Sequence, residues 1–229
     1  MNTYPVIILA GGKGTRLSSV VSDVPKPIAL VNGKPFLHYI FSYLQKQQIK
    51  QVILSVGYLS DVIIQYFGSE YLGIKIKYVI EKEALGTGGA IKYAFEQIDE
   101  AAYVINGDTF FNIDLKQLAN KHADAVIALK PMEKFERYGT VELDNDSRII
   151  HFLEKQYCEE GLINGGIYFI QKSVFDKIQT PDSFSMEKNI FEKHADDLKI
   201  QGKIFTDYFI DIGIPEDYYL AQHYFSSLL

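Results

Sequence analysis

Apolar runs and amphipathic segments alternate through the first half of the chain. Four short segments are either continuously apolar or alternate apolar with polar residues, a pattern typical of strands: residues 6–10, 52–56, 74–80 and 101–105. Three other segments carry apolar residues at helical spacing: residues 35–47, 60–67 and 87–98. This alternation predicts an α/β fold built on a doubly wound, largely parallel sheet.

The second half of the chain is richer in predicted strands. Strands are predicted at residues 125–129, 139–143, 149–153 and 166–170, and helices at residues 185–197 and 215–228. The polar run Asp144-Asn145-Asp146-Ser147 is typical of a hairpin turn between two of these strands. Asp114 is expected to cap the segment that follows it. Residues 1–229 are therefore predicted to form a single domain with a mixed sheet.

The composition indicates a globular protein and narrows its partners. Hydrophobic residues make up 47% of the 229 residues, and the net charge is −6, from 23 basic and 29 acidic residues. An acidic chain has no general electrostatic attraction for nucleic acid. The single cysteine, Cys158, allows no internal disulfide, and no apolar run reaches the ~20 residues that span a bilayer. We therefore expect a cytoplasmic protein without a nucleic-acid or membrane partner.

A glycine-rich loop follows the first predicted strand. Residues 9–17 read LAGGKGTRL, and the tripeptide PKP follows at residues 25–27. Glycine lets backbone N–H groups approach a ligand closely, and Lys13, Arg16 and Lys26 place positive charge around the turn. Glycines and cations at the end of a strand suit a polyphosphate. The competing interpretation is a turn with solvated basic side chains.

This loop does not fit two common nucleotide-binding motifs. No stretch matches the P-loop pattern G-x-x-x-x-G-K-[ST]. The dinucleotide pattern G-x-G-x-x-G fits at Gly12 and Gly14, but Leu17 occupies the third glycine position. The acidic residue expected after the second strand is also missing, since that strand ends Ser55-Val56-Gly57. A nicotinamide-dependent oxidoreductase is therefore disfavoured.

Further short motifs follow the loop in order along nearly the whole chain. They read NGKP at residues 32–35, LGTGGA at 85–90, NGD at 106–108, FLEK at 152–155, NGG at 164–166 and DIG at 211–213. Together with the loop, this series resembles the sugar-1-phosphate nucleotidylyltransferases. The resemblance implies a Rossmann-like, doubly wound mixed sheet of the nucleotide-diphospho-sugar transferase type. It also implies a nucleotide-binding half at about residues 1–113 and a sugar-binding half at about residues 114–229.

The reaction follows from the same resemblance. A member of this family transfers a nucleoside monophosphate from a nucleoside triphosphate (NTP) to a sugar 1-phosphate and releases pyrophosphate, with Mg²⁺ as cofactor. Residues 23–37 are similar to members that join GTP to D-glycero-α-D-manno-heptose 1-phosphate for a surface polysaccharide. Other substrate pairs stay open: mannose 1-phosphate with GTP, or glucose 1-phosphate with CTP, UTP or dTTP. A nucleotide-sugar-binding subunit without catalysis is the alternative from another class.

Four catalytic residues are implied by the resemblance: Arg16, Lys26, Asp108 and Asp211. The planar fork of Arg16 suits the β- and γ-phosphates, and Lys26, between two prolines, would meet the α-phosphate or the sugar phosphate. Asp108 and Asp211 would hold Mg²⁺, which prefers oxygen ligands. The competing interpretations are a turn aspartate for Asp108 and a helix cap for Asp211.

The remaining predicted site residues divide between the two substrates. Those expected to bind the nucleotide are Leu9, Ala10, Gly11, Gly12, Lys13, Gly14, Thr15, Arg16, Glu81, Gly86, Thr87 and Gly107. Those expected to bind the sugar phosphate are Lys26, Glu154, Lys155, Asn164 and Gly165. A carboxylate such as Glu81 can accept hydrogen bonds from guanine, although a solvated loop glutamate explains it equally well. A β-bulge would equally explain the glycines after Asn164.

Aromatic residues are concentrated in the last predicted helix. They are Tyr218, Tyr219, Tyr224 and Phe225. Such side chains either pack inside a subunit or form an interface between subunits. Internal packing and a homodimer are therefore both compatible with the sequence.

Overall fold

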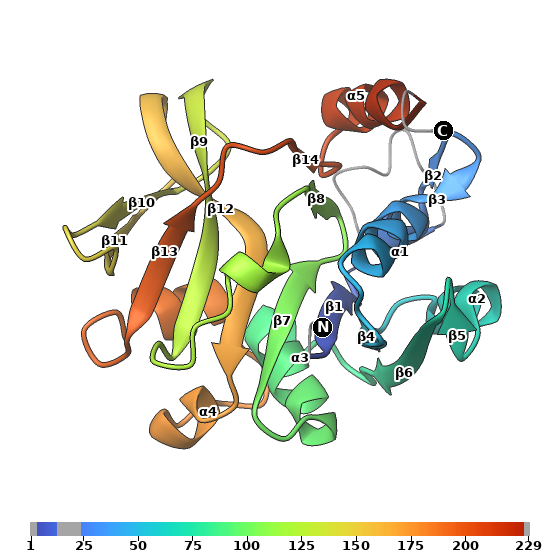
Figure 1. The fold of residues 1–229 in the computed structure, drawn as a ribbon, viewed down its shortest axis with the longest axis horizontal. Helices are drawn as coiled ribbons and strands as arrows, with labels where there is room; N and C mark the ends of the chain where they lie inside the picture. Colours follow the sequence, from blue (N-terminus) through green and yellow to red (C-terminus); the bar gives the residue numbers. More distant parts are fainter. Residues whose placement is uncertain (1–3, 13–23, 227–229) are drawn as a thin grey trace.

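The computed structural model describes residues 4–12 and 24–226. A mixed sheet runs through the molecule in the order β11-β10-β12-β7-β1-β4-β6-β5, with β9 and β13 joined to it beside β12 (Figure 1). The strands of this sheet are β1 (Val6–Ala10), β4 (Gln51–Val56), β5 (Glu70–Tyr71), β6 (Ile74–Ile80), β7 (Ala101–Asn106), β9 (Ala125–Phe135), β10 (Thr140–Leu143), β11 (Ile149–Leu153), β12 (Cys158–Gln171) and β13 (Ile200–Ile204). This arrangement confirms the predicted doubly wound mixed α/β sheet.

Helices and two small ladders complete the fold. The α-helices are α1 (Phe36–Lys46), α2 (Ser60–Phe67), α3 (Gly86–Ala94), α4 (Val174–Lys177) and α5 (Pro215–Ser226). Short 3₁₀ turns lie at Lys26–Ile28, Phe95–Gln97 and Leu115–Gln117, and a π-helical segment lies at Met186–Glu192. The ladders pair β2 (Leu30–Val31) with β3 (Lys34–Pro35) and β8 (Thr109–Phe111) with β14 (Phe209–Asp211).

The parallel strands end together at one edge of the sheet. β1 pairs in parallel with both β4 and β7, and β4 pairs in parallel with β6. The register places Leu9 opposite Asn106, Ala10 opposite Val56, and Val56 opposite Ile80. Loops that leave these strands are therefore neighbours, which is where doubly wound sheets bind ligands.

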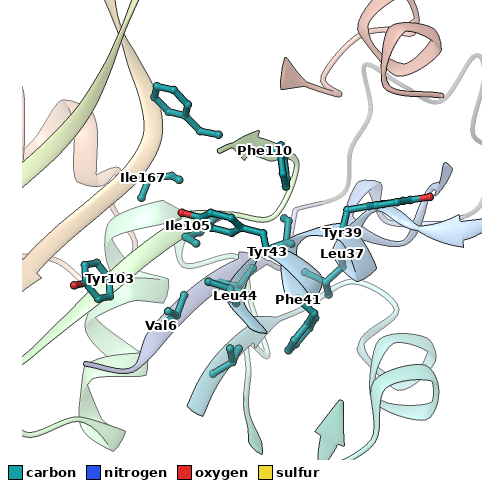
Figure 2. Close-up of a cluster of buried hydrophobic side chains, with 14 of the residues drawn as sticks. Val6, Leu37, Tyr39, Phe41, Tyr43, Leu44, Tyr103, Ile105, Phe110 and Ile167 are labelled. Carbon is teal, nitrogen blue, oxygen red and sulfur yellow. The ribbon is translucent and has the colours of Figure 1, made fainter. Parts of the chain in front are cut away.

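Two apolar layers cover the sheet. Val6 and Ile8 face the layer that contains α1, whereas Ile7 between them faces the layer that contains α3. Figure 2 shows Val6 and Ile105 of the sheet in one cluster with Leu37 and Leu44 of α1. Because both faces of the central strands are buried, their sequences are continuously apolar rather than alternating.

Several predicted elements differ from the structure in their limits. β9 and β12 are much longer than predicted, because their polar ends pair with each other along an exposed antiparallel ribbon from Cys158–Phe135 to Leu162–Pro131. The helix predicted at residues 185–197 is a π-helical segment that ends at Glu192. The helix predicted at residues 87–98 ends at Ala94 and continues as a 3₁₀ turn.

Two local predictions about aspartates are confirmed. The Asp114 side chain accepts a hydrogen bond from the Lys116 N–H at 3.0 Å and caps the 3₁₀ turn after it. The Asp144 side chain accepts hydrogen bonds from the N–H groups of Asp146 and Arg148 in the hairpin turn between β10 and β11. The division of the chain into halves near residue 113 stays a prediction.

Candidate active site

A cavity of about 380 Å³ lies where β1, β6 and β7 end and α3 begins. Eight of the predicted site residues line it: Leu9, Gly11, Gly12, Lys26, Glu81, Gly86, Thr87 and Asp108. Pro27, Ala84, Ala90 and Asn106 complete the lining. The predicted loop residues Lys13, Gly14, Thr15 and Arg16 lie outside the described residues. The structure thus brings six of the eight described residues of the predicted nucleotide set to one cavity, and Ala10 and Gly107 do not line it.

Glu81 is held rigidly in the wall of this cavity. The Ser55 hydroxyl donates to Glu81 Oε1 at 2.9 Å, and the Leu85 N–H donates to Glu81 Oε2 at 3.2 Å. A Cβ built on Gly11 would lie only 2.6 Å from Glu81 Oε1, so glycine is needed for this close approach. Each carboxylate oxygen keeps a lone pair for a ligand, and Glu81 is not a freely solvated loop glutamate.

Lys26 and Asp108 form an ion pair at the edge of the cavity. Lys26 is the first residue of a 3₁₀ turn and lies between Pro25 and Pro27, and it is only 8% exposed. Its Nζ donates to Asp108 Oδ2 at 3.1 Å. Asp108 follows β7 in the turn that leads into β8. The lysine predicted to meet a phosphate therefore lies beside the first predicted metal ligand.

The β8–β14 ladder brings the second predicted metal ligand to the same place. Asp211, the last residue of β14, is opposite Thr109, and the Ile212 N–H donates to the Asp108 carbonyl at 2.9 Å. Figure 1 shows this ladder beneath α5. The Gly213 N–H donates to Asp211 Oδ1 at 2.7 Å and fixes that carboxylate.

The pKa of Asp211 is raised to about 6, first by burial and then by the Asp108 charge, although Lys26, the Gly213 N–H and Arg137 act in the opposite direction. Two neighbouring carboxylates supply oxygen donors of the kind that a hard divalent cation prefers. Among residues 4–12 and 24–226, no cluster of three or more His, Cys, Asp or Glu side chains could hold a metal. Substrate phosphates or water would have to complete such a coordination sphere.

Three of the five predicted sugar-phosphate residues line a second cavity, whereas Lys26 lines the first and Gly165 lines neither. Glu154, Lys155 and Asn164 line a space of about 210 Å³, and the Glu154 side chain is 80% exposed. Gly165 faces the Phe111 ring, which would lie 2.6 Å from an added Cβ. The register of β12 against β9 shifts between Asn164 and Tyr168, so the β-bulge interpretation of these glycines describes the backbone correctly. Sugar binding by these residues stays a prediction.

Comparison with known proteins identifies the family. The model of the nucleotidyl transferase family matches residues 5–227. The chain belongs to the nucleotidyl transferase family. It is 54% identical to two D-glycero-α-D-manno-heptose 1-phosphate guanylyltransferases: that of Campylobacter jejuni, over 93% of this chain and 96% of the relative, and that of Aneurinibacillus thermoaerophilus, over 94% and 96%.

The same relationship is found among solved structures. The crystal structure of HddC from Yersinia pseudotuberculosis aligns with a TM-score of 0.89 and 38% identity, over 97% of this chain and 100% of that chain. The same protein has also been solved in complex with GMP-PN. As a nucleotidyl transferase, this chain is an enzyme that transfers a nucleotidyl group to a sugar 1-phosphate. No helix within the described residues is long and apolar enough to cross a membrane.

Some residues of the nucleotidyl transferase site have backbone roles. The Gly107 N–H donates to the Leu9 carbonyl at 2.9 Å, and an added Cβ would lie 2.5 Å from that oxygen. Ala10 is buried inside β1. Gly86 has φ of +69°, and its Cβ would lie 2.5 Å from the Phe184 carbonyl oxygen. Gly107 and Gly86 are therefore required by close packing, whether or not they also contact substrate.

Sequence reasoning missed three polar residues of the site. Asn106 lines the first cavity, and its buried Oδ1 has no hydrogen-bond partner among the described residues. Ser55 is completely buried and orients Glu81. Glu187 lines the second cavity and accepts a hydrogen bond from Thr87, which lines the first. A polar serine inside the apolar run 52–56 was a usable signal, whereas Glu187 lies 100 residues from Thr87 and had none.

Proposed function

We propose that this enzyme joins GTP to D-glycero-α-D-manno-heptose 1-phosphate, giving GDP-D-glycero-α-D-manno-heptose and pyrophosphate. The 54% identity to two relatives of that name, across nearly their full length, carries this proposal. An oxygen of the sugar phosphate attacks the α-phosphorus of GTP. The bond from the α-phosphorus to the bridging oxygen of the β-phosphate breaks, and pyrophosphate leaves.

The geometry of Glu81 supports guanine as the base. Guanine presents two neighbouring donors, N1–H and the 2-amino group, whereas uracil and thymine present one. The two oxygens of Glu81 are held in place by Ser55 and the Leu85 N–H and each keeps a free lone pair. A carboxylate fixed in this way matches a pair of neighbouring donors, whereas cytosine presents its 4-amino donor beside the acceptor N3.

Asp108 and Asp211 are the residues that would hold Mg²⁺ in this proposal. The bound cation would supply charge that screens the two anionic substrates from each other. Lys26 contributes a fixed positive charge at the same edge, because its Nζ is held against Asp108 in a largely buried position. Catalysis by these residues consists of positioning and electrostatic stabilisation, since no proton has to be moved in the transfer step.

Pyrophosphate release tests the proposal. The purified enzyme is incubated with heptose 1-phosphate and MgCl₂ and, in turn, with GTP, CTP, UTP, dTTP and ATP; parallel reactions contain mannose 1-phosphate or a chelator. Release with GTP and heptose 1-phosphate that stops with chelator is the expected result. Equal release with another triphosphate would overturn the guanine assignment, and a preference for mannose 1-phosphate would overturn the heptose assignment.

We also propose a cytoplasmic homodimer that supplies activated heptose for a surface polysaccharide. A triphosphate substrate supports the location, because nucleoside triphosphates are used inside cells. Exposed apolar side chains near α5 support the dimer: Leu30, Tyr219 and Leu220 are each more than half exposed. In contrast, Tyr218 and Phe225 are buried within the subunit. Light scattering of the purified protein distinguishes a dimer from a monomer.

A further inference from the structure

Glu187 lies between the two cavities and connects them through hydrogen bonds. It belongs to the π-helical segment and lines the second cavity. The hydroxyl of Thr87 reaches Glu187 Oε2 at 2.6 Å, and that of Ser185 reaches the same oxygen at 2.7 Å. The buried Tyr168 hydroxyl reaches Glu187 Oε1 at 3.1 Å. Three hydroxyl groups therefore converge on one carboxylate.

The number of protons fixes the direction of each of these hydrogen bonds. A carboxylate only accepts, so each hydroxyl donates its single proton to Glu187. Each hydroxyl oxygen must then act as an acceptor toward its other neighbour. All three do so: Thr87 accepts from the Met186 N–H at 2.9 Å, Ser185 from the Lys188 N–H at 3.2 Å, and Tyr168 from Asn164 Nδ2 at 3.0 Å.

The phenol of Tyr168 keeps the proton that this arrangement needs. Burial and the neighbouring Glu187 charge raise the pKa of Tyr168 well above its ordinary value, although the hydrogen bonds from Asn164 and Asn106 act in the opposite direction. Tyr168 therefore remains a donor to Glu187 throughout the physiological pH range.

The directions of these hydrogen bonds also fix the orientation of Asn164, which lines the second cavity. Tyr168 can only accept from Asn164, which identifies the Asn164 atom beside it as the amide nitrogen. The Gly166 N–H donates to Asn164 Oδ1 at 2.9 Å and fixes the other end of the amide. One N–H and one oxygen lone pair of Asn164 are left for a ligand. The amide is thus locked in one of its two orientations.

The same direction limits what Thr87 can bind in the first cavity. Its proton is committed to Glu187 and one lone pair to Met186, so it offers a ligand only an acceptor. A donor group of the nucleotide, such as a ribose hydroxyl, matches this position. A phosphate or carbonyl oxygen does not.

We propose that Glu187 is a positioning residue that sets the hydrogen-bonding direction of Thr87 at the nucleotide subsite and of Asn164 at the sugar subsite. This inference rests on the proposed function, because it assigns one substrate to each cavity. Glu187 lines the second cavity and is hydrogen-bonded to Thr87, which lines the first. It acts through one hydroxyl on each side.

Three variants separate the two arms of this network. Tyr168→Phe removes the group that accepts from Asn164, so the KM for heptose 1-phosphate should rise roughly five- to tenfold, the value of about one hydrogen bond. Tyr168 is also a partner of Asn106 in the first cavity, so the KM for GTP should rise less than that for heptose 1-phosphate. Thr87→Val should give the reverse pattern. Glu187→Gln replaces one carboxylate oxygen, which accepts from the hydroxyl groups, by an amide nitrogen, which donates. This variant should raise both KM values. Tyr78→Phe is the matched control, because the Tyr78 hydroxyl donates to the Gly68 carbonyl, away from Glu187 and from both cavities, and it should change neither value.

The inference is tested by comparing the KM for GTP with the KM for heptose 1-phosphate in each variant, and not by a loss of activity. Thermal unfolding of each variant measures the structural cost separately, and calorimetric titration with GTP gives a second reading for Thr87→Val. Equal effects of Tyr168→Phe and Thr87→Val on both substrates, or an unchanged KM in Glu187→Gln, would overturn it. Wild-type turnover tests the proposed function on its own. If the wild type uses another triphosphate or sugar 1-phosphate, the same ratios are measured with that pair.

Discussion

Replacement of Asp211 by asparagine should make the metal-free protein more stable while it abolishes turnover. Burial and the charge of Asp108 raise the pKa of Asp211 from 3.8 to about 6. Asparagine has no charge to bury and none to oppose Asp108. Its side-chain oxygen can still accept the hydrogen bond from the Gly213 N–H that Asp211 Oδ1 now receives. On the proposed role of Asp211 in holding Mg²⁺, this residue costs stability in the absence of the cation.

The sign and size of this effect follow from linkage. The folded state binds the Asp211 proton more tightly than the unfolded state, so the free energy of unfolding falls as the pH rises from about 4 to about 6. Above pH 6 the full penalty applies, and a shift of about two pKa units corresponds to at most about 3 kcal/mol. Near pH 5 roughly half of this penalty remains. For a domain of this size, each kcal/mol corresponds to roughly 2–4 °C in Tm.

Urea unfolding of the wild type and Asp211→Asn in the presence of a chelator measures the difference. The variant should be more stable near neutral pH, and its advantage should shrink to about half near pH 5. Pyrophosphate release should be lost in the same preparation. MgCl₂ should stabilise the wild type more than the variant. An Asp211→Asn protein that is less stable near neutral pH, or whose advantage does not depend on pH, would refute this reasoning.

Four other substitutions test separate parts of the site. Lys26→Met should lower kcat by roughly 10²–10³-fold, because a preorganised charge is lost, and initial rates at saturating substrate will measure this; a loss confined to KM would contradict it. Asp108→Asn should reduce pyrophosphate release to background without altering the circular dichroism spectrum. Gly107→Ala places a Cβ 2.5 Å from the Leu9 carbonyl oxygen and should lower the free energy of unfolding in urea by about 1–3 kcal/mol. Glu81→Gln should raise the KM for GTP about tenfold and leave that for the sugar phosphate unchanged, whereas an unchanged KM for GTP would argue against base recognition by this residue.

The limits of several elements could be read from the sequence alone. Strands at residues 6–10, 74–80 and 149–153 and the helix at 60–67 begin and end where they were predicted. Each shows its own periodicity, and turn residues lie close to most of their ends. In contrast, the outer part of β12 carries polar residues such as Glu159 and Glu160. It is a strand only because β9 pairs with it, and this long-range pairing has no local signal.

Some residues of the candidate site could also be predicted from the sequence, and others could not. Glu81 and Asp108 could be predicted because each lies within two residues of the end of a recognisable strand, and parallel strands end at a common edge. The partners that orient the site could not be predicted: Ser55 faces Glu81 from a neighbouring strand, and Glu187 reaches Thr87 from a distant segment. Hydrogen bonds between distant segments depend on the completed fold, so periodicity does not reveal them.

The packing of the glycines determines which experiments can report on substrate contact. Gly107 packs against the end of β1 beside Asp108, and Gly86 packs against Phe184 beside Thr87. A larger residue at either glycine would displace the backbone that carries these side chains. A loss of activity in such a variant could therefore come either from a lost contact between the glycine and the substrate or from the displaced backbone. Substitutions of Thr87, Asp108 or Glu81 change polar atoms that line the cavity and leave those glycines in place. The roles predicted for the glycine motifs must therefore be tested through the side chains that they position.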